Sequence, residues 1–305
     1  MAHENPLAYV LGLEGLALLR SFTGGEGDRA FVEARITEIR ALLDDPSLAA
    51  GAVDVARVGS VDGYHVWSRT YDSPNTAFLF DEPFLGEILD GLPAGTALDA
   101  ACGTGRVSEL LARRGHRVVG VDSSPEMLDR ARTRVPEGDF RSGDLERLPV
   151  PDASVDLVVC SLALTHVPGL GPVMAEFARV LRPGGHLVTS DLHAEQVLRG
   201  SIPSVRLPDG TPGRIETHPH TAGDYLRAAL PAGFRVRRCE EPLPQAPDAT
   251  SPGTANGTPE RPRMTELGPW DLWPWCLIDL VPDAAAAAAA GAPVEIIWHF
   301  QLAGH

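Results

Sequence analysis

A short apolar run that ends in an acid and then turns through two glycines carries the clearest chemical signal in this chain. Residues 97–105 read Ala-Leu-Asp-Ala-Ala-Cys-Gly-Thr-Gly, which predicts a buried strand followed by a sharp turn at Gly103 and Gly105. A second apolar run, 118–121, closes on Asp122, whose carboxylate can accept hydrogen bonds from both hydroxyls of a ribose. A glycine turn that opens a helix attracts negatively charged groups. The pattern therefore predicts a cofactor with a ribose and a negatively charged group above the turn.

The residues around the turn bear on which cofactor it holds. A dinucleotide fingerprint has a third small residue, Gly or Ala, after its Gly-x-Gly. Here Ser108 takes that place, and Asp99 precedes the turn as an acid that suits an ammonium group better than a diphosphate. Both residues favour a cofactor other than a dinucleotide.

This segment resembles the class I S-adenosylmethionine (SAM)-dependent methyltransferases, whose glycine loop reads Asp-x-Gly-x-Gly-x-Gly. Ala101 stands where the family has its first glycine. The resemblance continues in register through residue 193 and is closest to the subgroup that includes ubiquinone and menaquinone biosynthesis methyltransferases and many natural-product tailoring enzymes. It implies an α/β fold with a doubly wound, Rossmann-like sheet of seven strands, the last of them antiparallel. It also implies SAM as the cofactor and S-adenosylhomocysteine as its product.

The resemblance assigns expected roles to residues beyond the glycine loop. In the family's second motif an acid holds the ribose and an apolar residue packs on the adenine, and Asp122 and Met127 match those positions. In the third motif, the side chain of Asp144 and the backbone N–H of Leu145 are expected to read the edge of the adenine.

Three further segments follow the same resemblance. Residues 155–161 match the fourth strand of the family, and residues 181–187 match the turn into the fifth. Tyr71 belongs to a Tyr-Asp pair that often covers the methionine end of the cofactor in this family. No metal ligand is expected. The expected cofactor-binding residues are Tyr71, Asp99, Ala101, Gly103, Gly105, Asp122, Ser123, Met127, Asp144, Leu145 and Ser161.

Methyl transfer from a sulfonium needs positioning and exclusion of water, and a hydroxyl or carboxyl acceptor also needs a base or a deprotonated substrate. Ligands in open α/β sheets bind beyond the carboxyl ends of the strands, so we expect the acceptor near residues 64–72, 161–166 and 191–194. His193, after the fifth strand, is the first candidate for a general base, and a backbone-capping role is the alternative. His166, after the fourth strand, is the second candidate, with helix entry as its alternative.

Two further groups of residues have open interpretations. His218 and His220 could join His193 and Asp191 around a metal, but no third ligand has a fixed spacing, so a solvent-side loop is the expectation. Four tryptophans near the end of the sequence either line an apolar or planar acceptor pocket or fasten the tail to the core. They are Trp270, Trp273, Trp275 and Trp298.

Composition bounds the class of protein and its partners. The chain has 305 residues, 44% of them hydrophobic, which is enough for one large α/β core with appendages. Its formal net charge of -15, from 41 acidic and 26 basic residues, repels a phosphate backbone. Nucleic acid is therefore not expected as a partner, and an acidic carrier protein is disfavoured less strongly.

The sequence predicts a cytoplasmic protein. Its four cysteines lie far apart without a Cys-x-x-Cys pair, which indicates reduced thiols. The apolar stretch 6–19 contains Glu14 and follows Glu4 rather than a basic residue, which argues against a signal sequence. No apolar run approaches the length that spans a membrane, so no membrane partner is expected.

The elements that position these residues begin with a helical segment. Residues 1–60 contain two predicted helices, 7–22 and 28–43, separated by glycines. A minimal methyltransferase lacks this segment, which is expected to act as a cap or as an oligomer contact. A homodimer is therefore an open possibility.

The rest of the chain divides into three predicted regions. Residues 61–240 form the SAM-binding core, and residues 241–263 hold six prolines without apolar periodicity, which predicts a mobile loop. Residues 264–305 are expected to supply C-terminal helices and the final strand, so the sheet carries a long insertion before that strand.

Together these observations predict SAM-dependent transfer of a methyl group to a small-molecule acceptor, directed to oxygen or nitrogen, in secondary metabolism or tailoring. Two other classes stay open: non-methylating chemistry with bound SAM, such as a cyclase or decarboxylase, and a non-catalytic SAM-binding regulatory protein. The intact residues Asp99, Gly103 and Asp122 argue against the last class, because a decayed site is expected to lose some of them.

Overall fold

The computed structural model describes residues 1–23, 27–68, 71, 78–244, 267–268 and 270–304. Its contacts divide the chain into two compact units, each built from separate stretches of sequence. The N-terminal unit comprises residues 1–59, 200–216 and 243–292. The sheet unit comprises residues 60–199, 217–242 and 293–305.

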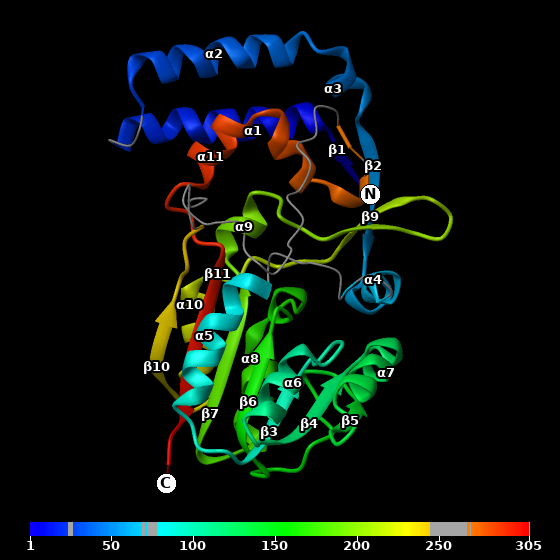
Figure 1. The fold of residues 1–305 in the computed structure, drawn as a ribbon, viewed down its shortest axis with the longest axis vertical. Helices are drawn as coiled ribbons and strands as arrows, with labels where there is room; N and C mark the ends of the chain where they lie inside the picture. Colours follow the sequence, from blue (N-terminus) through cyan, green and yellow to red (C-terminus); the bar gives the residue numbers. More distant parts are fainter. Residues whose placement is uncertain (24–26, 69–70, 72–77, 245–266, 269, 305) are drawn as a thin grey trace. The chain divides into compact units, whose positions relative to one another are not determined.

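A seven-stranded sheet forms the centre of the sheet unit (Figure 1). Its strand order is β10-β11-β7-β6-β3-β4-β5, and every neighbouring pair is parallel except the two pairs made by β11. The predicted fold class, a doubly wound sheet with an antiparallel last strand, is confirmed. The strands are β3 (Thr96–Ala100), β4 (Arg117–Asp122), β5 (Asp139–Ser142), β6 (Val155–Ser161), β7 (Leu181–Leu192), β10 (Phe234–Glu240) and β11 (Glu295–Leu302).

Helices cover both faces of this sheet because side chains on β3, β4, β6, β7 and β11 alternate between two apolar clusters. Leu85 and Leu89 of α5 and Leu111 of α6 pack on one face, and Phe177 of α8 and Tyr225 of α10 pack on the other. The helices of the unit are α4 (Ser60–Trp67), α5 (Phe78–Asp90), α6 (Arg106–Arg113), α7 (Pro125–Arg134), the 3-10 turn η2 (Leu164–His166), α8 (Leu170–Val180), α9 (Ala194–Leu198) and α10 (Ala222–Ala229).

The N-terminal unit combines a helical layer with a second, smaller sheet. Its four strands have the order β1-β2-β9-β8, and β2 and β9 run parallel although a long stretch of chain separates them. The two predicted helices are present as α1 and α2 (Figure 1). The elements are β1 (Ala2–Glu4), α1 (Pro6–Arg20), η1 (Ser21–Thr23), α2 (Arg29–Leu43), α3 (Pro46–Ala50), β2 (Val53–Val58), β8 (Ser204–Arg206), β9 (Pro212–Ile215), η3 (Trp270–Leu272), η4 (Trp275–Leu280) and α11 (Pro282–Ala289).

The observed units divide the chain differently from the predicted regions. Residues 200–216 fall within the predicted core, 61–240, but belong to the N-terminal unit because β9 hydrogen-bonds to β2. From the predicted C-terminal region, 264–305, only residues from 293 onward join the seven-stranded sheet. Most of the predicted loop, 241–263, lies outside the described residues.

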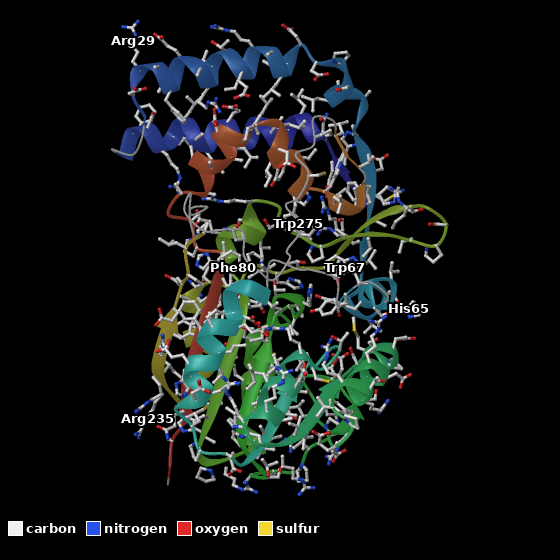
Figure 2. The ribbon with its side chains drawn as sticks, in the orientation of Figure 1. Arg29, His65, Trp67, Phe80, Arg235 and Trp275 are labelled. Atoms are coloured by element: carbon white, nitrogen blue, oxygen red, sulfur yellow. The ribbon has the colours of Figure 1, made fainter. Side chains whose placement is uncertain are left out.

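The tryptophans separate between the two units. Trp270 and Trp273 are buried in the apolar core of the N-terminal unit, and Trp275 begins η4 (Figure 2). Trp298 is buried in the core of the sheet unit. These contacts agree with a role in fastening the tail. Within the described residues, no helix has the length and apolar character needed to cross a membrane.

Candidate active site

A cavity opens at the carboxyl ends of β3, β4 and β6, within the sheet unit. It encloses about 820 Å³ of space, its open mouth included. All but two of the eleven expected cofactor-binding residues line it. Those that do are Tyr71, Ala101, Gly103, Asp122, Ser123, Met127, Asp144, Leu145 and Ser161.

Asp99 and Gly105 are the two expected residues that do not line the cavity. Asp99 is only 1% exposed and accepts a hydrogen bond of 2.6 Å from the Ser108 hydroxyl, so it links β3 to α6. Burial raises the pKa of Asp99 to about 6. A Cβ on Gly105, whose φ is +85°, would lie 3.0 Å from Cα of Ala131 in α7. Asp99 and Gly105 therefore support the glycine loop on the side away from the cavity and do not form the cavity surface.

The glycine loop and Asp122 form one hydrogen-bonded unit. Asp122 accepts the backbone N–H of Gly103 with one oxygen and that of Ser124 with the other, both at 2.8 Å. Burial raises the pKa of Asp122. Because a carboxylate offers about four acceptor sites, it keeps capacity for hydroxyl groups in the cavity that it lines.

The backbone at Gly103 provides a test of whether a cofactor fits this cradle. Its φ is +51°, and a Cβ built there meets no atom within 4 Å, so the position faces open space. A larger side chain would fill the cavity at that point. The loop thus has the shape and the acid that the ribose of a nucleoside cofactor requires.

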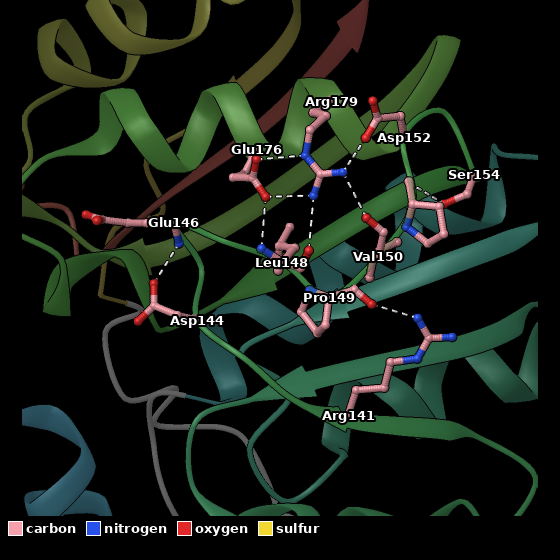
Figure 3. Close-up of polar contacts among 11 residues, drawn as sticks. Arg141, Asp144, Glu146, Leu148, Pro149, Val150, Asp152, Ser154, Glu176 and Arg179 are labelled. Atoms are coloured by element: carbon pink, nitrogen blue, oxygen red, sulfur yellow. Dashed lines mark hydrogen bonds and ion pairs between the residues drawn. The ribbon is translucent and has the colours of Figure 1, made fainter.

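The loop that carries Asp144 is held by one arginine of α8, as Figure 3 shows. The Arg179 guanidinium donates to both carboxylate oxygens of Glu176, at 2.8 and 2.7 Å, and to Asp152. It also donates to the carbonyls of Leu148 and Val150, at 3.1 and 2.9 Å. The planar guanidinium therefore fixes the path of the loop behind the cavity wall.

Aromatic side chains from α4 and the segment after it line the cavity opposite the glycine loop. The Tyr64 hydroxyl lies 2.8 Å from Nε2 of His166, and their ring centroids are 5.2 Å apart. Tyr64 also makes edge contacts with Trp67 and Tyr71 (Figure 2 labels Trp67). Burial raises the pKa of Tyr64 well above its usual value, so the phenol keeps its proton and can donate it to Nε2 of His166 when that nitrogen carries no hydrogen.

His193 occupies a different place from His166. Its Nδ1 accepts the backbone N–H of Glu195 at 3.2 Å and so caps α9, and its Nε2 lies 3.4 Å from Glu241. His193 does not line the cavity, whereas His166 does. The geometry agrees with the backbone-capping alternative for His193.

A buried ion pair stands behind Ser161, at the end of β6. Asp81 of α5 is fully buried and accepts two hydrogen bonds from the Arg106 guanidinium, at 2.9 and 2.7 Å. The hydroxyls of Ser161 and Ser190 also donate to Asp81, at 2.6 and 3.1 Å. Nothing in the local sequence around Asp81 indicated this role, because its partners come from three other elements.

His218 and His220 stabilise the turn after β6. The backbone N–H of His218 donates to the carbonyl of Thr165 at 2.7 Å, and His220 is buried with Nε2 2.9 Å from the carbonyl of Val167. The expectation of a solvent-side loop was therefore wrong for His220. In the described part of the chain, no three His, Cys, Asp or Glu residues are grouped to hold a metal ion.

Comparison with known proteins points to one family. Residues 98–189 match the model of a methyltransferase domain. The chain is 41% identical over 114 residues to a malonyl-[acyl-carrier protein] O-methyltransferase of Serratia marcescens, covering 36% of this chain and 45% of that protein. It is 34% identical over 164 residues to a demethylmenaquinone methyltransferase of Renibacterium salmoninarum, covering 53% and 62% respectively. The chain thus spans less than two thirds of either relative.

The fold has counterparts among solved structures. A putative S-adenosylmethionine-dependent methyltransferase from Listeria monocytogenes superposes with a TM-score of 0.51 at 18% identity. The match covers 72% of this chain and 96% of that one. At this identity the similarity shows a shared fold.

Proposed function

We propose that this chain, which carries a class I SAM-dependent methyltransferase domain, transfers a methyl group from SAM to a small-molecule acceptor that loses a proton in the reaction. The observation that carries the proposal is the cavity itself. Residues from three strand ends converge there with a half-buried pair, Tyr64 and His166, which also lines the cavity.

The residues present fit the cofactor that the family and fold imply. Asp122 would bind the ribose, Met127 and Leu145 would contact the adenine, and Tyr71 and Ser161 would border the methionine end. When bound, SAM supplies a methyl group that is already electrophilic. The chain is therefore left with three tasks: to orient the acceptor, to exclude water and to receive a proton.

The aromatic side chains of α4 perform the second task. Tyr64 and Trp67 contact each other edge to face with centroids 5.9 Å apart, and Tyr71 adds a third ring. His65, labelled on the same helix in Figure 2, lies 3.1 Å from Glu126 of α7. Of these rings, Tyr64 and Tyr71 line the cavity, where they would help to keep water from a reacting centre.

The pair Tyr64–His166 performs the third task. An acceptor hydroxyl that meets the Tyr64 oxygen can pass its proton to that oxygen while the phenol proton moves to Nε2 of His166. The tyrosine returns to its neutral state, and the positive charge forms on the imidazole. Proton transfer by positioned groups of this kind contributes about 10²- to 10⁴-fold to a rate. This pair favours an oxygen acceptor over a neutral amine, which needs no base.

A two-stage experiment tests the proposal. Calorimetry with SAM and with S-adenosylhomocysteine measures binding, and methyl-labelled SAM with a panel of small hydroxyl, carboxyl and amine compounds measures transfer. We expect both ligands to bind and label to appear in a hydroxyl compound with release of S-adenosylhomocysteine. Binding without any transfer would support the cyclase, decarboxylase or regulatory alternatives, and absence of binding would exclude all of them.

A further inference from the structure

Asp191 is a buried carboxyl at the end of β7 that does not line the cavity. It is 1% exposed, and its two oxygens accept different backbone donors. One accepts the N–H of Thr165 at 2.6 Å, and the other accepts the N–H of Leu192 at 2.8 Å. Asp191 therefore connects the end of β7 with the turn that follows β6.

That turn is η2, which presents His166 to the cavity. Thr165 is its middle residue, so the hydrogen bond to Asp191 acts on the backbone immediately before His166. The opposite side of the turn is held by the N–H of His218, which donates to the carbonyl of Thr165. Asp191 and residues 217–220 thus clamp η2 from two sides.

We propose that Asp191 is a positioning residue, which holds η2 so that His166 Nε2 meets the Tyr64 hydroxyl. The assignment rests on the proposed function, because the position of His166 matters only if the pair handles a proton. Asp191 touches neither Tyr64 nor the cavity in this role and acts through the backbone of Thr165.

The chemistry of the position supports this assignment. A carboxylate is costly to bury without a cation, and burial raises the pKa of Asp191 to about 7. Asn or Ser could not accept two N–H donors with two separate oxygens, which is what the ends of β7 and η2 require.

Nuclear magnetic resonance of the ¹⁵N-histidine-labelled protein with bound S-adenosylhomocysteine tests the proposal without a known acceptor. The His166 ring signals are assigned from His166→Gln, and Tyr64→Phe gives their position when the hydrogen bond is absent. Asp191→Asn places an NH₂ group against one of the two backbone N–H donors, so one of these hydrogen bonds is lost. We therefore expect η2 to shift and the Tyr64–His166 hydrogen bond to break. The His166 ring signals should then lie close to those in Tyr64→Phe. Affinity for S-adenosylhomocysteine should stay close to that of the wild type.

Thr189→Val is the matched control. Thr189 is buried on the same strand and face, and its hydroxyl makes no hydrogen bond among the described residues. The His166 signals should not move in this variant. If Asp191→Asn leaves too little folded protein, Asp191→Ser, whose shorter side chain has a single oxygen in place of the two that bind separate donors, gives the same comparison.

The outcomes separate this proposal from the one on which it rests. Unchanged His166 signals in Asp191→Asn, or equal changes in Asp191→Asn and Thr189→Val, would overturn the positioning role while S-adenosylhomocysteine still binds. A wild-type protein that binds neither SAM nor S-adenosylhomocysteine would instead overturn the proposed function.

Discussion

Tyr64 and His166 are 102 positions apart in the sequence, yet their Oη and Nε2 atoms lie 2.8 Å apart in the wall of the cavity. One comes from a helix that precedes the seven-stranded sheet and the other from a turn after its central strand β6. In the proposed mechanism, the contact joins two elements that must both be in place before a proton can be transferred.

The first prediction concerns this pair. His166→Ala and Tyr64→Phe should each lower turnover of a hydroxyl acceptor by about 10²- to 10⁴-fold, because each removes one member of the proton path. SAM affinity should change little, since ribose and adenine contacts lie elsewhere. Single-turnover rates and calorimetry measure the two effects. His193→Ala serves as the control and should retain most activity, and a large loss there would restore His193 as the base.

The second prediction concerns cofactor binding. Asp122→Ala should weaken binding of SAM and S-adenosylhomocysteine by about 1.5 to 3 kcal/mol, because charge-assisted hydrogen bonds to the ribose are lost. Gly103→Val should be worse, since its side chain would enter the cavity and oppose a positive φ. Titration calorimetry compares both with Asp129→Ala, on α7. Equal affinities for Asp122→Ala and the wild type would remove this acid from the site.

The third prediction concerns Arg179. Arg179→Lys should lower the free energy of unfolding by about 1 to 2 kcal/mol, because an ammonium cannot reproduce the planar fork that binds Glu176 and two backbone carbonyls. A looser loop around Asp144 should also weaken S-adenosylhomocysteine binding. Urea unfolding and calorimetry check both effects. Arg40→Lys, at an exposed arginine on α2, is the control and should change neither.

The fourth prediction concerns pH and Glu295, which is 1% exposed and has no hydrogen-bond partner among the described residues. Burial, followed by the charges of Asp81 and Asp191, raises the pKa of Glu295 from 4.5 to about 9. The folded protein therefore keeps a proton that the unfolded chain releases above pH 4.5. This contribution to stability is complete below that pH and is lost as the pH rises toward 9, by up to about 1.4 kcal/mol per pH unit.

Glu295→Gln removes this titration. The variant should match the wild type in urea unfolding at pH 5 and be more stable than the wild type at pH 8. Glu146→Gln removes the same charge from an exposed position and should show no such divergence. Parallel stability curves for wild type and Glu295→Gln across this range would show that the buried carboxyl does not titrate as described.

That most of the residues expected to bind the cofactor line one cavity could be predicted from the sequence, because the pattern around each is local. Gly103 follows β3 and Asp122 ends β4, and the strand-turn-helix pattern alone indicates that both lie at the carboxyl edge of the sheet. Asp99 shows the limit of such patterns. It belongs to the same motif, but whether its carboxyl faces the cavity or Ser108 depends on the packing of α6, which periodicity does not give.

The remainder depends on contacts between distant segments. Asp81 lies near the start of α5. Its role as a hydrogen-bond acceptor is evident only in the folded structure, where Arg106, Ser161 and Ser190 donate to it. The pairing of β2 with β9 also could not be predicted from the sequence. Parallel pairing between strands that are far apart in the chain produces no local residue pattern that would indicate it.

The N-terminal unit is assembled from three separate stretches of chain, and this has a consequence for how the protein emerges from the ribosome. The apolar side of α1 packs with α11, and β2 needs β9, yet α11 ends only at Ala289. Residues 1–59 therefore leave the ribosome well before α11, and their core cannot close until α11 has been made, while domains usually fold as they are made. During that interval Val10, Leu13 and Ala17 have no native partner from α11 to cover them. Nascent chains shortened before α11 should therefore be more sensitive to protease in residues 1–59 than chains that include α11.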